Sequence, residues 1–344
     1  MAEQIITENY AIYNDDNMKV MQSFPDCSID FSVYSPPFCG LYQYSSDPED
    51  LSNCASYDEF FEHYDYVIQE KHRLTKPGRM TAVHCADIFK NQGGYEHTID
   101  DFSGDIIRHH TRLGWKYVAR IHIWKEPLAV RNRTMVSSLH HATLVKDSTM
   151  VSFANADYLL IFRRSGKNEV PVVHPRGIMN YAGAGKGEDF TEPSDGIPKE
   201  VLGKRGYKGN QINNSYSQWI WRQYASCNWY DIRVDRTLGT GAGLYSGNKA
   251  DKDEPDEKHM HPLQLDVIER AVTLWTNPGE TVLTPFMGVG SEVYGAVING
   301  RKGVGIELKP TYFRQAAANL ASIGTDKDVS KVNKNETREF SFSD

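Results

Sequence analysis

The sequence has no apolar run close to the ~20 residues that a membrane-spanning helix requires. Its first residues, MAEQ, also lack the basic and then apolar stretches that mark a secretory signal. We therefore expect a cytoplasmic protein with no membrane partner.

Cysteine is scarce, and its spacing excludes the usual frameworks. The 5 cysteines include no C-x-x-C pair and no paired histidine spacing, so we interpret them as reduced thiols. We expect no metal site. His84 and Cys85 end a predicted strand, and without further clustered ligands we interpret them as a packed strand terminus.

Excess positive charge is absent too, because 38 basic residues face 45 acidic ones and the net charge is -7. This balance excludes a protein coated in basic surface. It does not exclude nucleic acid, since only a local patch has to be positive. The charged and hydrophobic fractions, 24% and 40%, are typical of a globular protein, and we find no internal repeat.

What the sequence does contain is an alternation of strand and helix patterns. We expect strands at 30–35, 79–85, 117–124, 158–162, 281–284 and 302–307, and helices at 57–74, 99–113, 262–275 and 291–299. Strands that alternate with helices predict an α/β fold with a doubly wound, mostly parallel sheet.

The alternation stops between residues 165 and 258, which are rich in Gly, Pro, Asn and Tyr. This stretch is too long for an ordinary loop and predicts an inserted or appended subdomain. The predicted organisation is 1–164 and 259–324 as two halves of one domain, 165–258 as the irregular insertion, and 325–344 as a polar C-terminal tail.

One unusual strand ending is SVYSPPFCG, residues 32–40. Pro36 and Pro37 lack the N–H that a ladder needs and fix φ, so they end the strand in a rigid turn. Taken alone, this motif favours a simple strand-ending turn with a buried Phe38.

A second motif, VLTPFMGVGSEVYGAVINGRKGVGIELKPTYF, follows residue 281. Gly288 and Gly290 let the backbone approach a ligand, and Glu307 ends the next strand, where a carboxylate can accept ribose hydroxyls. A lone pair of such glycines more often serves packing only. Since no third glycine follows early in the helix, the pattern favours a nucleoside cofactor without a pyrophosphate over NAD.

Together, SPPF at 35–38 and PFMGVG at 285–290 resemble the amino-group DNA methyltransferases that use S-adenosylmethionine. With the catalytic motif first and the cofactor motif last, the chain looks like the β-type permutation of that family. The resemblance implies a Rossmann-like methyltransferase fold, base flipping, and a target-recognition role for residues 165–258.

The resemblance also implies site residues. The catalytic group is Ser35, Pro36, Pro37 and Phe38. The cofactor-binding group is Asp16, His261, Pro262, Thr284, Pro285, Phe286, Gly288, Gly290, Ser291 and Glu307. The family usually has Asp where this chain has Thr284, and a hydroxyl supplies no charge for the methionine ammonium, so we expect weaker cofactor binding or compensation by Asp16 or another acid.

Two basic stretches are candidate DNA contacts, residues 199–236 and 130–146. The residues that we assign to DNA are Arg131, Arg133, Lys204, Arg205, Lys208 and Arg222. The first stretch interleaves its basic residues with Tyr and Trp, and the alternative is a small aromatic core with a solvated charged rim.

A Ser at the first motif position is, by family tendency, more common among enzymes that act on cytosine N4 than on adenine N6. The family resemblance implies double-stranded DNA as the substrate. The serine favours cytosine as the methylated base, with adenine as the alternative. A catalytically weakened DNA-binding protein and a methyltransferase acting on RNA or protein are further alternatives. The oligomeric state stays open, with a homodimer as one option.

Overall fold

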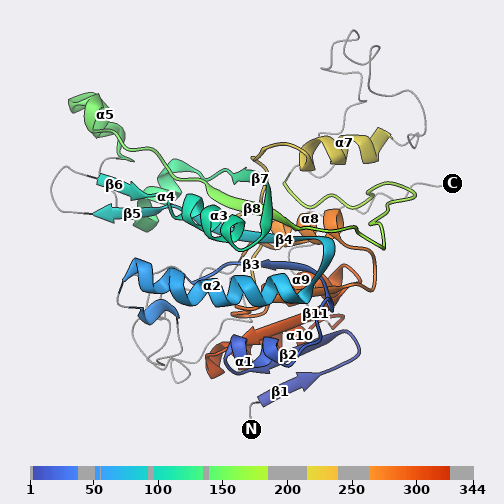
Figure 1. The fold of residues 1–344 in the computed structure, drawn as a ribbon. Coiled ribbons are helices and arrows are strands. Elements are labelled where there is room, and N and C mark those ends of the chain that lie inside the picture. Colours follow the sequence, from blue (N-terminus) through green and yellow to red (C-terminus); the bar gives the residue numbers. More distant parts are fainter. Residues whose placement is uncertain are drawn as a thin grey trace.

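The computed structural model describes residues 3–37, 51–54, 56–91, 97–134, 139–184, 215–238 and 263–325. Its centre is a nine-stranded sheet (Figure 1). The strands, in spatial order, are β1 (Glu3–Ile6), β2 (Tyr10–Asn14), β11 (Lys302–Glu307), β10 (Thr281–Thr284), β3 (Ile29–Tyr34), β4 (Thr75–Ala86), β8 (Asp157–Arg164), β7 (Trp115–Ile123) and β9 (Asn228–Trp229).

The sheet is mostly parallel, as predicted. Strands β2, β11, β10, β3 and β4 run parallel to one another, whereas β1 is antiparallel to β2 and β8 is antiparallel to both β4 and β7. The carboxyl ends of β3, β4 and β7 therefore lie at the same edge as the amino end of β8. Polar groups from distant parts of the chain meet at this edge.

Helices cover both faces of the sheet, which confirms the doubly wound α/β class. On one face, α2 (Tyr57–Leu74) and α3 (Phe102–Arg112) bury aromatic side chains against β3, β4 and β8. On the other face lie α8 (Leu265–Trp275), α9 (Ser291–Ile298) and α10 (Pro310–Ala321). A short helix, α1 (Asn17–Gln22), follows β2.

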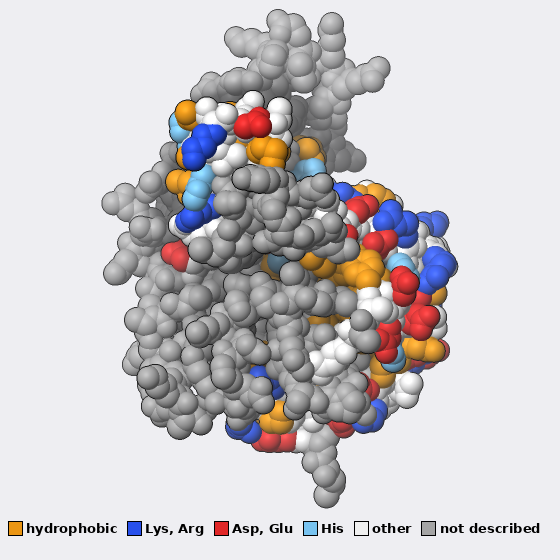
Figure 2. Space-filling model, turned by 90° about the vertical axis from the view of Figure 1, so that its left-hand side faces the viewer, with side chains coloured by type: hydrophobic (Ala, Val, Ile, Leu, Met, Phe, Trp, Pro, Cys, Tyr) orange, Lys and Arg blue, Asp and Glu red, His pale blue; other side chains and the backbone are white. Residues whose placement is uncertain are grey.

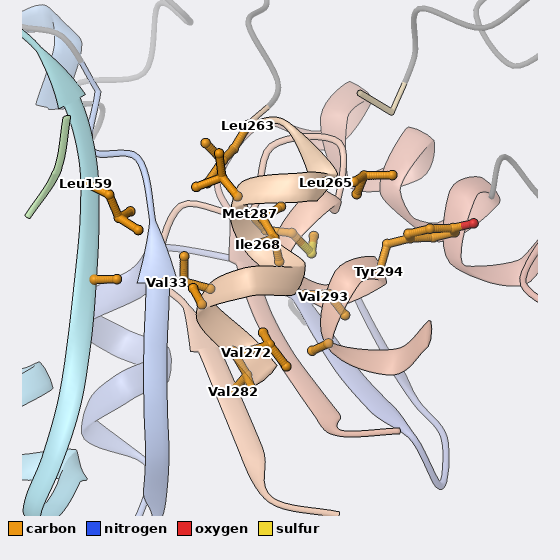
Figure 3. Close-up of a cluster of buried hydrophobic side chains, with 14 of the residues drawn as sticks. Val33, Leu159, Leu263, Leu265, Ile268, Val272, Val282, Met287, Val293 and Tyr294 are labelled. Carbon is orange, nitrogen blue, oxygen red and sulfur yellow. The ribbon is translucent and has the colours of Figure 1, made fainter. Parts of the chain in front are cut away.

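The core under α8 and α9 consists of branched aliphatic side chains. Val33 and Val282 project from β3 and β10 toward Ile268 and Val272 of α8 (Figure 3). All of these side chains are at most 2% exposed. Because alternate residues of a strand point to opposite faces, Val33 packs here while Tyr34 packs against α2.

Several elements lie outside this layered body. They are the hairpin β5 (Ile88–Asn91) and β6 (His97–Asp100), α4 (Pro127–Thr134), α5 (His141–Lys146) and α7 (Ser215–Tyr224). The helix predicted from residue 99 starts instead at Phe102, because Asp101 caps the backbone N–H of Gly104 and Ile99 pairs with Phe89 in the hairpin.

Three further observations concern the described ranges. None of the helices there is long and apolar enough to cross a membrane. Cys27, Cys54, Cys85 and Cys227 are free thiols, and Cys39 lies outside those ranges. The described part of the chain contains no group of three His, Cys, Asp or Glu side chains placed to hold a metal ion.

Candidate active site

The two sequence motifs meet because their strands are neighbours. Phe31 pairs with Val282 and Ser32 with Leu283, in parallel register. Ser35 and Pro285 therefore follow adjacent strands at the same edge of the sheet. The two motifs are about 250 residues apart in the sequence, but the pairing of β3 with β10 makes them neighbours in space.

The serine turn, which we define as residues 35–37, directly follows β3, because Pro36 and Pro37 prevent the strand from continuing. Ser35, Pro36 and Pro37 follow Tyr34 without regular structure, and Phe38 lies outside the described residues. Ser35 is half-buried, and its Oγ lies 2.9 Å from Nδ1 of His84. The hydroxyl thus sits at the sheet edge, partly open to an incoming ligand.

The glycine turn between β10 and α9 has the conformation that its glycines permit. Gly288 and Gly290 have φ of 54° and 91°, in the left-handed region. A Cβ on Gly290 would approach Ala316 of α10 to 3.1 Å, so this glycine is needed for packing. A Cβ on Gly288 would meet nothing within 4 Å, so the backbone there borders open space that a ligand can use.

Glu307 ends β11 and holds this turn. Its Oε2 accepts a hydrogen bond from the backbone N–H of Gly288 at 2.8 Å, and its Oε1 accepts one from Lys309 at 2.9 Å. The carboxylate is half-buried. A strand-end carboxylate beside Gly288 is the type of acceptor that hydroxyl groups of a ligand require.

Asp16 is the N-cap of α1, where its carboxylate accepts from the backbone N–H of Lys19 at 3.0 Å. Two asparagines that the sequence analysis missed place this cap beside the cofactor motif. The Asn14 amide donates to the carbonyls of Glu307 and Leu308, at 2.8 and 2.9 Å, and Asn17 donates to that of Pro285 at 3.3 Å. The structure thus brings Asp16, Pro285 and Glu307 together.

We call the group formed by Asp16, residues 284–291 and Glu307 the cradle. It contains buried hydroxyl oxygens that have no hydrogen-bond partner among the described residues. These are Oγ1 of Thr284 and Oγ of Ser291, neither of which has a hydrogen-bond partner among those residues. Buried hydroxyls normally have a partner, so this observation fits a polar ligand in the cradle. His261 and Pro262, also assigned to the cofactor, lie outside the described ranges.

A buried acid, Glu292, stands in the first turn of α9 and is only 5% exposed. Burial, with a smaller contribution from Glu307, raises the pKa of Glu292 to about 8. Glu292 therefore places an acid directly after the glycine turn, which itself lacks the usual Asp. In the sequence, this position indicated only that no third glycine follows early in the helix.

His84 does more than pack a strand end. Besides its contact with Ser35, its Nε2 lies 3.2 Å from Oδ2 of Asp157, and Nζ of Lys125 lies 2.6 Å from the same oxygen. Burial alone would raise the pKa of Asp157, but the hydrogen bond from His84 and the charge of Lys125 hold it well below its usual value. Ser35, His84, Asp157 and Lys125 thus lie in one row. In the sequence, the only signal for this row is that these polar residues stand near the ends of predicted strands.

Beneath the serine turn, α2 contributes a fully buried lysine. Nζ of Lys71 donates to the hydroxyl of Tyr34 at 2.5 Å and to that of Thr81 at 3.2 Å. Burial lowers the pKa of Lys71 well below its usual value, since no acid compensates for its lost hydration. This group supports Tyr34, the residue before Ser35.

The candidate DNA contacts at residues 130–146 fall on α4 and α5. Arg131 lies on α4, where its guanidinium donates to Asn132 at 2.9 Å, and Arg133 is on the same helix. Leu144 and Val145 of α5 are 51% and 72% exposed. On the protrusion that contains α5, hydrophobic, basic and histidine side chains lie together (Figure 2).

The basic stretch at residues 199–236 forms mainly a small core in the part that is described. Trp219 and Tyr224 of α7 are buried with Ile178 and Ile220, as the alternative interpretation predicted. Arg233 and Arg236 form ion pairs with Asp266 of α8 at 2.5 and 2.6 Å. Arg222 is half-buried on α7, while Lys204, Arg205 and Lys208 lie outside the described ranges.

The fold and the edge site define a class of protein: a Rossmann-like α/β enzyme scaffold with a glycine turn and a strand-end acid suited to a nucleoside cofactor. A family model described as DNA methylase, of the N6/N4 type, matches residues 29–318. The chain therefore belongs to the N6/N4 DNA methylase family.

Individual relatives agree with this assignment. The chain is 24% identical over 315 residues to the type II methyltransferase M.BglII of Bacillus subtilis, covering 88% of this chain and 66% of that protein. It is 33% identical over 90 residues to the DNA adenine methyltransferase YhdJ of Escherichia coli K12, covering 25% of this chain and 31% of YhdJ. The chain thus spans less than two thirds of the length of either protein.

Solved structures share the fold. TTHA0409 from Thermus thermophilus has a TM-score of 0.56 at 20% identity, with 92% of this chain and 94% of that chain covered. TTHA0409 has also been crystallised with S-adenosyl-L-methionine. PvuII DNA methyltransferase, which is cytosine-N4-specific, has a TM-score of 0.51 at 14% identity, with 95% and 92% covered.

Proposed function

We propose that this protein is a site-specific DNA methyltransferase, which transfers a methyl group from S-adenosylmethionine to the exocyclic amine of a flipped base. The observation that carries the proposal is the adjacency of β3 and β10, with the serine turn and the glycine turn at one sheet edge. Membership of the N6/N4 DNA methylase family supports the same reaction.

The residues of the edge suit this cofactor. Glu307 would accept the ribose hydroxyls beside the open backbone of Gly288, and Asp16 would face the adenine end. The unsatisfied hydroxyls of Thr284 and Ser291 would bind the polar methionine end, together with His261 and Pro262. When bound, S-adenosylmethionine supplies an electrophilic methyl group on a positively charged sulfur.

The serine turn would prepare the amine. An exocyclic amine is a poor nucleophile because its lone pair is delocalised into the ring. Hydrogen-bond acceptors at the Ser35 hydroxyl and the Pro36 carbonyl favour a pyramidal nitrogen and stabilise the charge that develops on it. Pro36 and Pro37 hold these acceptors in place, and Phe38 would stack on the flipped base, which is worth ~1–3 kcal/mol.

For the base, we favour cytosine N4, with adenine N6 as the alternative. Ser35 is a neutral acceptor, which is the family tendency for cytosine. The local similarity to YhdJ, described as a DNA adenine methyltransferase, favours adenine instead. Residues 165–258 would recognise the target sequence, and the basic residues of α4 and α7 would contact the phosphates of double-stranded DNA.

The test uses the full chain, unmodified double-stranded DNA and S-adenosylmethionine with an isotopically labelled methyl group. After digestion to nucleosides, mass spectrometry identifies N4-methylcytosine or N6-methyladenine. Ser35→Ala is the matched variant, and Thr111→Ala, an exposed hydroxyl that bonds within α3, is its control.

Each outcome of this assay favours one interpretation. Methylation by the wild type and the control, with a ~10²-fold lower rate for Ser35→Ala, supports the proposal. Cofactor binding without any DNA methylation would instead favour the alternative function, a catalytically weakened DNA-binding protein. That alternative is motivated by Thr284, which stands where the family usually has Asp.

A further inference from the structure

Four polar side chains form a continuous row along the sheet edge. Ser35 Oγ lies 2.9 Å from His84 Nδ1, His84 Nε2 lies 3.2 Å from Asp157 Oδ2, and Lys125 Nζ lies 2.6 Å from that oxygen. His84 and Asp157 are only 9% and 6% exposed. Since Ser35 is half-buried, the row is shielded along its length and accessible at its serine end.

Strand pairing places this row. Ser35 and Lys125 follow the carboxyl ends of β3 and β7, His84 stands near the end of β4, and Asp157 begins β8. His84 lies opposite Leu159 in the antiparallel register, so Asp157, two residues earlier, is on the same face of the sheet. Side chains held by paired strands keep their geometry better than side chains on loops.

The hydrogen bonds have a definite direction. The low pKa of Asp157 keeps its carboxylate ionised, and an ionised carboxylate only accepts hydrogen bonds. His84 must therefore donate its Nε2–H to Asp157. In the neutral imidazole the lone pair is then on Nδ1, where it accepts the O–H of Ser35, and the serine oxygen can accept from a substrate amine.

Lys125 completes the charge balance. Its ammonium and the Asp157 carboxylate form a pair in which both side chains are 9% exposed. Because Lys125 already neutralises the carboxylate, no second positive charge is required on His84 in the resting site.

We propose that Ser35 and His84 form the exit route for the proton that the amine loses on methylation, with Asp157 as the positioning residue for His84. This inference rests on the proposed methyltransferase function. As the new N–C bond forms, the bond from the methyl group to the sulfur of S-adenosylmethionine would break, and the positive charge of that sulfur would pass to the amine nitrogen, which then has to lose one N–H proton. That N–H bond breaks toward Ser35 Oγ while the serine proton moves to His84 Nδ1.

The balance of this transfer is simple. One N–H bond of the product amine is exchanged for one Nδ1–H bond of His84, and the serine hydroxyl is regenerated. The resulting imidazolium is stabilised by Asp157, and its proton passes to solvent after the product leaves. A positioned proton acceptor of this kind typically contributes 10²–10⁴-fold to a rate.

The experiment compares His84→Gln with Asp157→Asn in single-turnover methylation of DNA, alongside separate cofactor and DNA affinities. The matched control is His109→Gln, which removes another histidine–aspartate pair, 2.7 Å from Asp65, between α3 and α2. Glutamine can still accept a hydrogen bond from Ser35 but cannot take its proton. We expect a ~10²-fold lower transfer rate for both site variants, affinities within about twofold of wild type, and a wild-type rate for the control.

A second measurement needs no variant to be active. The ¹⁵N shifts of labelled histidine, with His84 assigned by its loss in His84→Gln, report which ring nitrogen carries the proton. Protonated Nε2 with bare Nδ1 supports the proposal, and protonated Nδ1 would overturn it. If the wild type methylates DNA and His84→Gln is equally fast, only the proton exit is wrong; if the wild type methylates nothing, the proposed function fails as well.

Discussion

The ring of Tyr34 lies 5.9 Å from the ring of Phe286, with the two planes tilted by 39°. Tyr34 immediately precedes Ser35, and Phe286 stands two residues before Gly288, so this contact joins the serine turn to the glycine turn. Both rings also reach Tyr64 of α2, whose hydroxyl is 2.7 Å from that of Tyr34. The two halves of the site therefore share one aromatic support.

This arrangement separates the roles of two phenylalanines. Phe38→Ala should lower methyl transfer ~10-fold or more with little change in cofactor affinity, because the proposed role of Phe38 is to stack on the base. Phe286→Ala should impair both, since Phe286 supports both turns. Single-turnover rates and calorimetric cofactor titrations measure the difference. A collapse of cofactor binding in Phe38→Ala would show that the base pocket is misassigned.

Glu307→Gln tests the cofactor cradle. The substitution keeps the shape of the side chain but replaces a charged acceptor of the Gly288 N–H by a neutral amide. Charge-assisted hydrogen bonds contribute about 1.5–3 kcal/mol, so we expect a ~10- to 100-fold higher Kd for S-adenosylmethionine. Glu169→Gln, an exposed acid paired with Lys167, is the control. Equal affinities for the two variants would remove Glu307 from the binding site.

Glu292 should make folding stability fall as the pH rises. Because the folded-state pKa of about 8 exceeds the ordinary value of 4.5, the folded protein binds the proton more tightly than the unfolded chain. Stability is then full below about pH 4.5 and decreases until the pH has passed about 8. At pH 9 the free energy of unfolding of Glu292→Gln should therefore exceed that of wild type by at least about 1 kcal/mol, as measured by urea unfolding. Equal stability at pH 5 and pH 9 in both proteins would contradict this expectation.

Lys71 should have the opposite effect. Its pKa is lowered in the fold, so the unfolded chain binds its proton more tightly and stability rises with pH from the lowered pKa toward 10.5. His110, which is buried beside it and has a lowered pKa as well, contributes in the same direction. Between pH 6 and 9, Lys71→Met should remove the part of the rise in unfolding free energy with pH that Lys71 contributes. Urea unfolding across that range measures it, with the exposed Lys116→Met as control.

DNA contact by α4 and α7 can be measured through salt dependence. Arg131→Ala and Arg222→Ala should each reduce the slope of log K against log salt by about 1 if the guanidinium meets a phosphate. Lys167→Ala is the control, because Lys167 follows the end of β8 at the opposite edge of the sheet. An unchanged slope would assign the two arginines to the solvated surface.

Elements with strong local signals were predicted to the residue. The bounds of α2, β10 and β11 agree with those expected, because an amphipathic repeat and flanking Lys-Pro-Gly or Gly residues define them locally. The hairpin of β1 and β2 and helix α10 were not predicted. Strand β1 is exposed on most of its residues, so its sequence lacks the alternation that marks a half-buried strand.

By itself, the sequence determined the chemistry of the two turns. Pro36 and Pro37 end a strand, and Gly288 and Gly290 adopt positive φ, because local steric rules act wherever these residues stand. Only the tertiary structure placed His84, Lys125 and Asp157 in one row with Ser35, and paired Arg233 with Asp266 instead of leaving it for DNA. These contacts depend on strand order, register and packing between segments that are distant in the chain, and no local pattern encodes them.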